Sequence, residues 1–191
     1  MSQKNLPSKS SGDRFVESLE SRTMRSVSVS FSNNVCYISS NNAGDEVVVE
    51  PYSEHGVNVL VREGVETWGF YGYGYADHVE ADMGGGDDIL DCSQLGSDIP
   101  CLIDAGADDD KIYGGAGGNY INGGTGTDEL YGGSSYDVIC GGVAWNNNND
   151  GADDIIDGYG IGNGGGDDLY TEGGHDTRAV YVGDIPHNTN P

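Results

Sequence analysis

The sequence predicts an all-β protein whose second half is a β-solenoid with two nine-residue rows in each coil. Three observations lead to this prediction. One apolar residue recurs at every ninth position, glycines recur in step with it, and the first third of the chain alternates polar and apolar residues. An amphipathic helix would place an apolar residue every three or four positions, so the nine-residue spacing excludes helices from the second half.

The nine-residue period is clearest in the middle of the chain. The apolar residues that carry it are Ile103, Ile112, Ile121, Leu130 and Ile139. The rows that contain the last four read AGADDDKIY (105–113), GGAGGNYIN (114–122), GGTGTDELY (123–131) and GGSSYDVIC (132–140). A short strand at positions seven to nine, with the eighth side chain pointing inward, fits this spacing. The six residues before it form a turn whose glycines supply positive φ values, and two rows complete one coil with loops along both edges.

The charge of the chain is strongly negative and unevenly distributed. The 191 residues include 32 acidic and 8 basic ones, a formal net charge of −24. Residues 1–30 hold five of the basic and three of the acidic residues, so the rest of the chain carries −26. Such a body repels nucleic acid and anionic lipid, which excludes both as partners. Acidic chains are often disordered, but the periodic glycines favour order if divalent cations neutralise the carboxylates.

The rows resemble the hemolysin-type, or RTX, calcium-binding repeats, whose consensus is GGxGxDxUx with U apolar. GGTGTDELY matches all four fixed positions, whereas its neighbours depart from the consensus at Ala105, Asp108, Asn119 and Ser135. Weaker rows extend the resemblance over residues 83–171: MGGGDDILD (83–91), NDGADDIID (149–157) and NGGGDDLYT (163–171). The last row fits in two registers, with Asp168 and Tyr170 or with Asp167 and Leu169 at the repeat positions.

The resemblance implies a right-handed parallel β-roll in which several Ca²⁺ ions lie between loops one coil apart. In the family, backbone carbonyls and the repeat aspartates ligate calcium, which takes six to eight oxygens. One edge would pair Asp110 with Asp128, and Asp88 would stack beyond Asp110. The implied metal ligands are Gly84, Gly86, Asp88, Gly106, Asp108, Asp110, Gly115, Gly117, Asn119, Gly124, Gly126, Asp128, Gly133, Ser135, Asp137, Asp154 and Asp168.

The opposite edge departs from the family pattern. It would pair Asn119 with Asp137, and the amide oxygen of Asn119 can still ligate an ion. One negative charge is lost there, so we expect weaker binding. The row that ends at Ile103 has Cys101 at the aspartate position and no glycine pair, so no ion is expected beside it.

The rest of the chain is predicted to flank this array. Residues 1–25 are expected to be disordered, residues 26–82 to form a β segment that starts or caps the solenoid, residues 83–177 to form the β-roll, and residues 178–191 to supply a closing strand and tail. Alternation predicts strands within 26–31, 35–39, 45–52 and 57–64. The segment WGFYGYGYADH (68–78) either packs between the cap and the first coil or exposes an aromatic strip for sugars.

Two interruptions and four cysteines complete the pattern. The segment 92–104 is longer than a row and predicts a wider turn. Val143–Asn148 is expected to be an exposed loop in which Trp145 caps the coil edge or binds a ligand. Cys36, Cys92, Cys101 and Cys140 lack zinc-ligand spacing. They are interpreted as small buried thiols, with a Cys92–Cys101 disulfide as the alternative.

The sequence favours a binding protein over an enzyme. It contains no HExxH or GxSxG motif, and its four histidines are isolated. Residues 15–29 resemble, at Leu19, Glu20 and Arg22, the Leu-Glu-x-Arg leader of many bacterial surface and secreted proteins. Met24-Arg25 departs from that leader, and the alternative is a mobile, mildly basic tail. The sequence contains no run of about 18 apolar residues, so it predicts no membrane-spanning helix.

We therefore expect a non-catalytic, extracellular calcium-binding repeat protein, secreted or at the cell surface, with cell-surface polysaccharide or protein as its partner. The alternative is an accessory or secretion module of an RTX-type enzyme or toxin whose active part lies elsewhere.

The first prediction concerns metal dependence. Each row buries on the order of one Ile or Leu, about 1.5–3 kcal/mol, whereas ordering nine residues costs about 1–2 kcal/mol per residue. We expect the array to be largely unfolded in chelator and compact in millimolar Ca²⁺, because ion binding then stabilises the fold. Far-UV circular dichroism and the hydrodynamic radius measure this. An unchanged spectrum and radius on adding EDTA would contradict it.

Overall fold

The computed structural model describes residues 27–53, 56–62, 68–142, 152–159, 167–171, 177–179 and 185–188. Within these residues the chain forms sixteen strands and no helix, so no helix there could cross a membrane. The all-β prediction is confirmed. The predictions for residues 1–25, for Val143–Asn148 and for Trp145 lie outside the described residues.

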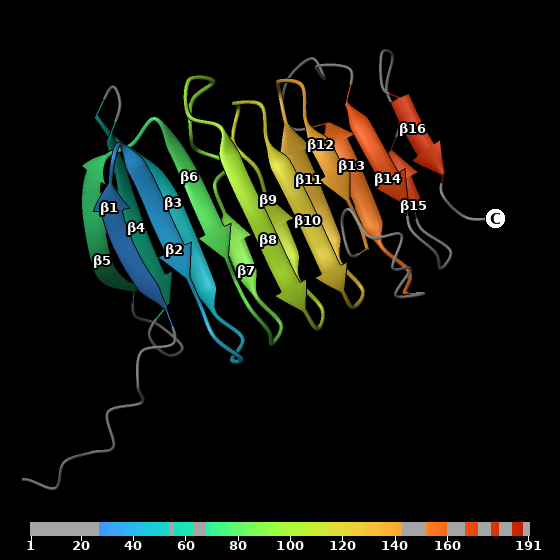
Figure 1. Ribbon diagram of the computed structural model, residues 1–191, viewed down its shortest axis with the longest axis horizontal. Coiled ribbons are helices and arrows are strands. Elements are labelled where there is room, and N and C mark those ends of the chain that lie inside the picture. Colours follow the sequence, from blue (N-terminus) through green and yellow to red (C-terminus); the bar gives the residue numbers. More distant parts are fainter. Residues whose placement is uncertain are drawn as a thin grey trace, which may run out of the picture.

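The strands form two eight-stranded sheets (Figure 1). Sheet A contains, in spatial order, β1 (Ser28–Ser32), β2 (Val35–Ser39), β6 (His78–Asp82), β8 (Cys101–Ala107), β10 (Tyr120–Thr125), β12 (Val138–Cys140), β14 (Asp168–Thr171) and β16 (Ile185–Asn188). Sheet B contains β15 (Thr177–Ala179), β13 (Ile155–Tyr159), β11 (Glu129–Gly133), β9 (Lys111–Tyr113), β7 (Ile89–Asp91), β3 (Glu46–Ser53), β4 (Gly56–Arg62) and β5 (Trp68–Tyr75). From β6 onward successive strands alternate between the sheets, as Figure 1 shows along the length of the molecule.

Neighbouring strands of each sheet in the repeat region pair in parallel, and we call the stretch from one strand to its partner in the same sheet a coil. Ile121 of β10 lies between Ile103 of β8 and Ile139 of β12, and Leu130 of β11 lies between Ile112 and Ile156. Three pairs are antiparallel: β1 with β2, β3 with β4, and β4 with β5. Both sheets are therefore mixed, with the antiparallel part confined to the N-terminal end.

The core is a layer of side chains between the two sheets, and the eighth residue of each row supplies it. Ile112, Leu130 and Ile156 from sheet B are 0% exposed, as are Ile139 and Leu169 from sheet A. Each of these short strands thus contributes one large, fully buried apolar side chain, as the period predicts. The core is narrow, because adjacent positions in each strand point outward.

The predicted N-terminal strands are confirmed, and they continue the sheets of the repeats. β2 pairs in parallel with β6, and β3 pairs in parallel with β7. The β1–β2 turn places Asn33 and Asn34 at φ values of 51° and 64°, as a two-residue hairpin turn requires. Val47 and Val79 are fully buried, so the inward column of the repeats extends into this region.

The aromatic segment of β5 divides between two faces. Gly72 and Gly74 face the Phe31 ring of β1, and a Cβ on Gly74 would lie 2.6 Å from that ring. Tyr73 and Tyr75 are 59% and 51% exposed, and the Tyr73 ring centroid lies 5.0 Å from that of Tyr52. One face of the strand therefore packs against β1, within the N-terminal segment and not between the cap and the first coil as predicted, while the other face presents tyrosines to solvent.

The wider turn at 92–100 folds inward. Cys92, Leu95 and Ile99 are buried, and Leu95 O accepts a hydrogen bond from Ala116 N at 3.0 Å. All four cysteines are buried and free, which confirms buried thiols over a Cys92–Cys101 disulfide. Burial raises the pKa of Cys36 to about 12, so this thiol stays protonated.

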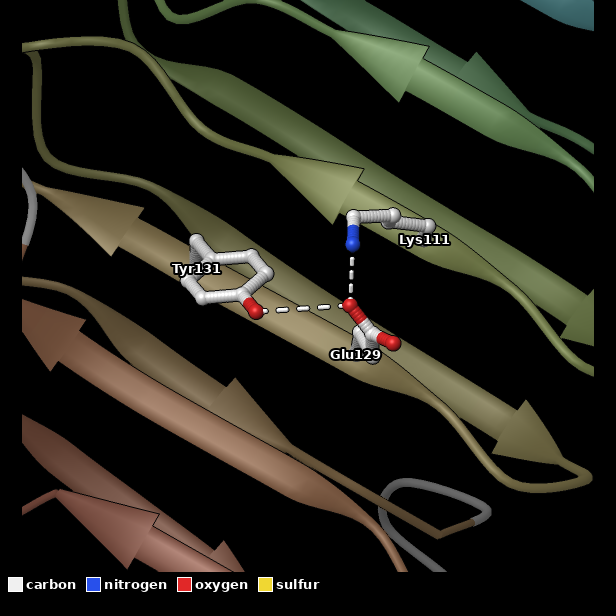
Figure 2. Close-up of polar contacts among 3 residues, drawn as sticks. All are labelled: Lys111, Glu129 and Tyr131. Carbon is white, nitrogen blue, oxygen red and sulfur yellow. Dashed lines mark hydrogen bonds and ion pairs between the residues drawn. The ribbon is translucent and has the colours of Figure 1, made fainter.

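The outer face of sheet B carries an ion pair and stacked tyrosines. Figure 2 shows Lys111 Nζ and Tyr131 OH both donating to Glu129 Oε2, the latter at 3.3 Å. The Tyr113 and Tyr131 rings stack with centroids 4.9 Å apart. The hydrogen bond from Lys111 lowers the pKa of Glu129, so both groups stay charged. Such contacts between exposed side chains add little to stability, and the core must hold the sheets together.

At the C-terminal end, the predicted closing strand 178–184 is only partly described. β15 covers Thr177–Ala179, and β16, which the sequence did not predict, covers Ile185–Asn188. They pair in parallel with β13 and β14, respectively.

A core substitution tests the two-sheet packing. Leu130→Ala removes a fully buried side chain between Ile112 and Ile156, and we expect it to lower the free energy of unfolding by about 2–5 kcal/mol. Leu102→Ala, at a side chain that is 47% exposed, should change it by less than about 0.5 kcal/mol. Urea unfolding in millimolar Ca²⁺ compares the two variants, and equal losses would contradict the described packing.

Candidate metal sites

The repeat loops form two stacks, one along each edge of the paired sheets. Loops of the first edge lead from sheet A to sheet B and end at Asp45, Asp88, Asp110, Asp128 and Asp154. Loops of the second edge lead from sheet B to sheet A and end at Cys101, Asn119, Asp137 and Asp167. We call two neighbouring loops of one stack a loop pair.

A ladder of hydrogen bonds runs along the first edge. In each loop pair, a backbone N–H donates to the Oδ1 atom of the next aspartate. The bonds are Asp45 N to Asp88 Oδ1 at 2.6 Å, Asp88 N to Asp110 Oδ1 at 2.8 Å, Asp110 N to Asp128 Oδ1 at 2.9 Å, and Asp128 N to Asp154 Oδ1 at 2.9 Å. The predicted stack of Asp88, Asp110 and Asp128 is therefore present.

The second edge repeats this ladder. Cys101 N donates to Asn119 Oδ1 at 3.0 Å, Asn119 N to Asp137 Oδ1 at 2.7 Å, and Asp137 N to Asp167 Oδ1 at 2.8 Å. The predicted pair of Asn119 and Asp137 is adjacent. The last bond also fixes the register of the final row.

Asp167, and not the predicted Asp168, takes the repeat position of that row. Asp167 is 0% exposed, and Leu169 occupies the inward position beside Ile139. Asp168 begins β14 and accepts a hydrogen bond from Tyr136 OH at 2.5 Å. The choice of Asp168 was wrong because Tyr170 and Leu169 are both acceptable apolar residues in sequence. Only pairing with β12 distinguishes them.

The aspartates of both ladders are buried acceptors. Asp88, Asp110, Asp128, Asp137, Asp154 and Asp167 are each at most 2% exposed. Within the described part of the chain, the Oδ2 atoms of Asp88, Asp110 and Asp137 accept no hydrogen bond. A buried ionised oxygen without a donor is strongly destabilising, so such oxygens are normally protonated, paired or bound to a metal.

Burial raises the pKa of these carboxyl groups. The pKa rises from 3.8 to about 7 for Asp88, about 6 for Asp110 and about 7 for Asp137. Desolvation is the largest cause in each case. The ladder N–H partly opposes it by stabilising the anion, and neighbouring carboxylates add to the rise. Without a cation, Asp88 and Asp137 therefore stay partly protonated up to about pH 7, and Asp110 up to about pH 6.

The first glycine of a row makes room for the carboxylate. A Cβ on Gly132 would collide with Asp137 Oδ2, and a Cβ on Gly123 would collide with both Asp128 Oδ2 and the carbonyl oxygen of Gly141. Carboxylate and carbonyl oxygens from successive coils thus approach one point. These first-position glycines were missing from the predicted ligands, although the GG pair of the rows signals them.

The predicted glycines let the loops stack closely. Gly124 and Gly126 have φ values of 106° and 127°, and a Cβ on either would collide with a carbonyl oxygen of the preceding coil. Gly84, Gly86 and Gly106 lie in the same stack with positive φ values. Gly133 of the second edge also has a positive φ value, whereas Gly115 and Gly117 pack against residues of the turn 92–100.

The two polar residues that replace fourth-position glycines have partners already. Asp108, at a φ of 78°, is exposed and accepts a hydrogen bond from Gly86 N at 3.0 Å. Ser135 Oγ donates to Ala116 O at 2.6 Å. Both lie within their predicted loop stacks, and each links two neighbouring coils.

Asp45 was missed as a ladder residue. It precedes the buried Val47 with the spacing of the repeats, but its loop lacks their glycine pattern. Its N–H donates to Asp88 Oδ1, and Ser40 Oγ donates to its Oδ2. The step from Asp45 to Val47 was the one available signal.

The donor set fits a hard cation such as Ca²⁺. Among the described residues, no three His, Cys, Asp or Glu side chains gather at one point, so side chains alone form no metal cage. The loop pairs of the first edge instead bring an aspartate oxygen close to a backbone carbonyl of the next coil, as Asp128 Oδ2 and Gly141 O show beside Gly123. Calcium accepts such mixed oxygen ligands in flexible geometry, and the bare Oδ2 atoms of Asp88, Asp110 and Asp137 are the oxygens that lack a partner.

The chain matches no protein-family model, no curated protein and no solved structure.

The raised pKa values predict a pH dependence for the metal-free protein. Because Asp88, Asp110 and Asp137 have a higher carboxyl pKa in the folded chain than the ordinary 3.8, the folded state binds more protons than the unfolded state between about pH 4 and pH 7. We expect the stability of the metal-free chain to fall as the pH rises through this range. Circular dichroism and urea unfolding in metal-free buffers at about pH 5 and pH 8 measure this. Equal stability at both values would contradict it.

Proposed function

We propose that this chain is a non-catalytic, extracellular calcium-binding protein, a right-handed parallel β-roll whose coils are joined by Ca²⁺ along its edges. Its use is interaction at the cell surface or in the matrix. The RTX resemblance of residues 83–171 and the parallel pairing of strands one coil apart support this proposal.

The observation that carries the proposal is the set of buried Oδ2 atoms of Asp88, Asp110 and Asp137. Each belongs to a carboxylate that is 0–2% exposed and whose other oxygen is held by a backbone N–H. All three are repeat aspartates of stacked loops, so the same loop geometry leaves Oδ2 without a donor in each of them. A bound cation satisfies them together and offsets part of the net charge of −24.

Within this proposal the chain prepares each site before an ion arrives. The ladder N–H fixes the plane of the carboxylate through Oδ1, which leaves Oδ2 for the ion. Glycines at the first, second and fourth positions let carbonyl oxygens of two coils approach each other. Ca²⁺, when bound, supplies the positive charge that these oxygens lack, and the energy of binding stabilises the fold.

The tyrosines on the outer faces support a role in surface interaction. Tyr52 and Tyr73 are each 59% exposed and lie together at the N-terminal end of sheet B. Tyrosine rings offer an apolar surface with a polar tip, which suits polysaccharide or protein partners.

Calcium titration of single-aspartate variants tests the proposal. Asp110→Ala and Asp137→Ala each remove a buried ladder carboxylate, one from each edge. We expect each variant to bind at least one ion fewer per chain than the unmodified protein and to need more Ca²⁺ for folding. Isothermal calorimetry gives the number of ions, and circular dichroism during the titration gives the folding midpoint.

Asp104→Ala is the matched control. It removes the same charge from an exposed position on β8, where the carboxylate accepts a hydrogen bond from the side chain of Asn122 at 2.8 Å. Its ion count should equal that of the unmodified protein. The proposal fails if the unmodified protein binds no calcium, or if all three variants keep the same number of ions.

A further inference from the structure

One loop pair of the second edge carries side-chain hydrogen-bond donors at two repeat positions. It consists of residues 114–119 and 132–137, and it carries two departures from the repeat consensus, Asn119 for aspartate and Ser135 for glycine. Both replacements introduce a hydrogen-bond donor. In the structure, both donors point at backbone carbonyl oxygens of this same loop pair.

The Asn119 amide nitrogen lies among three oxygen atoms. Nδ2 donates to Gly115 O at 2.9 Å, to Gly132 O at 3.1 Å and to Asp137 Oδ1 at 2.9 Å. Two of these oxygens belong to the neighbouring coil. The side chain is 1% exposed, so these contacts are shielded from water.

The orientation of this amide follows from its partners. Asn119 Oδ1 accepts from the backbone N–H of Cys101 at 3.0 Å, whereas Nδ2 faces oxygens alone. The opposite orientation would set Oδ1 against two carbonyl oxygens and the NH₂ group against an N–H donor. The expectation that the amide oxygen ligates an ion therefore fails to match the geometry, because that oxygen points to Cys101.

Ser135 satisfies a further carbonyl oxygen of this loop pair. Its Oγ donates to Ala116 O at 2.6 Å, across the two coils. On the other side of loop 114–119, Leu95 and Ile99 of the wider turn pack against Gly115 and Gly117. The carbonyl oxygens of Gly115, Ala116 and Gly132 thus all accept hydrogen bonds from side chains.

The corresponding loop pair of the first edge shows what the amide replaces. A Cβ on Gly123 would meet Asp128 Oδ2 and Gly141 O, while a Cβ on Gly114 would meet Asn119 Nδ2 and Gly132 O. Gly123 and Gly114 occupy the same position in their rows. Beside Gly114 lies the amide nitrogen of Asn119, where the carboxylate oxygen of Asp128 lies beside Gly123.

Resting on the proposed function, we propose that the Asn119 amide, with Ser135, takes the place of a cation in the loop pair 114–119/132–137. This loop pair is closed by hydrogen bonds and binds no calcium, whereas Asp137 Oδ2, which accepts no hydrogen bond among the described residues, remains available to an ion. The number of ions on the second edge is set by the residue at position 119.

Restoring the repeat consensus tests this assignment. The double variant Asn119→Asp/Ser135→Gly removes both donors and adds a carboxylate oxygen, and we expect it to bind one calcium ion more per chain than the unmodified protein. In chelator it should be less stable than the unmodified protein, and calcium should restore its stability. Calorimetry and metal analysis of the full chain give the ion count, and urea unfolding gives the stability.

Asn119→Ala separates a hydrogen-bonding role from a ligand role. It removes the donor without adding an oxygen, so its ion count should equal that of the unmodified protein and its lost stability should not return with calcium. Asn122→Asp is the charge control, since it adds one carboxylate on the outward side of the same strand. Its ion count should not change.

The outcomes distinguish this inference from the proposed function. The inference is overturned if the unmodified protein binds calcium but the double variant gains no ion, or if Asn119→Ala loses one. If the unmodified protein binds no calcium under any condition, the proposed function itself fails. A gain of one ion by the double variant alone, with Asn122→Asp unchanged, supports the substitution of the amide for a cation.

Discussion

The fold depends on the different roles of the two carboxylate oxygens of each repeat aspartate. Oδ1 accepts the N–H of the preceding coil, as between Asp88 and Asp110 or between Asn119 and Asp137, and this bond aligns neighbouring loops. Oδ2 then lies inside the loop pair, because the loops stack at the spacing of paired strands, about 4.8 Å. The same bond that orders the loops therefore creates a buried acceptor, and only a proton, a donor or a cation can satisfy it.

Charge makes this arrangement more demanding along the first edge. Asp88, Asp110, Asp128 and Asp154 follow one another without interruption. Two unit charges about 4.8 Å apart repel by roughly 3 kcal/mol at an effective dielectric constant near 20. One buried Leu or Ile per row contributes a comparable amount in the opposite sense. Burial of one apolar side chain per row therefore does not outweigh the repulsion between ionised carboxylates of neighbouring coils. A cation placed between them would turn this repulsion into attraction.

The sequence predicted the parts of the structure that a nine-residue period determines. Inward residues such as Ile112 and Leu130, the stacked loops and the two edges all follow from spacing, because one register slip would move every apolar side chain outward. The N-terminal strands followed from period-two alternation. The register of the last row stayed open between Asp167 and Asp168 because Leu169 and Tyr170 both suit the apolar position, and Asp45 was missed because its loop lacks the glycine pattern. The direction of the Asn119 amide depends on its contact with Cys101 N, eighteen residues earlier, which no local pattern reveals.

The two edges differ in how their ladders begin, and in both cases a side-chain donor pairs with an oxygen of the ladder. On the first edge the described ladder begins at Asp45, whose Oδ2 accepts a hydrogen bond from Ser40 Oγ. On the second edge it begins at Cys101 and Asn119, where the amide donates to Gly132 O of the next coil. Each coil of a stacked fold is stabilised by its neighbours, so coils held by ordinary hydrogen bonds provide a surface on which ion-dependent coils can order. These donors lie at the N-terminal side of both described ladders, where hydrogen bonds join neighbouring coils without a cation.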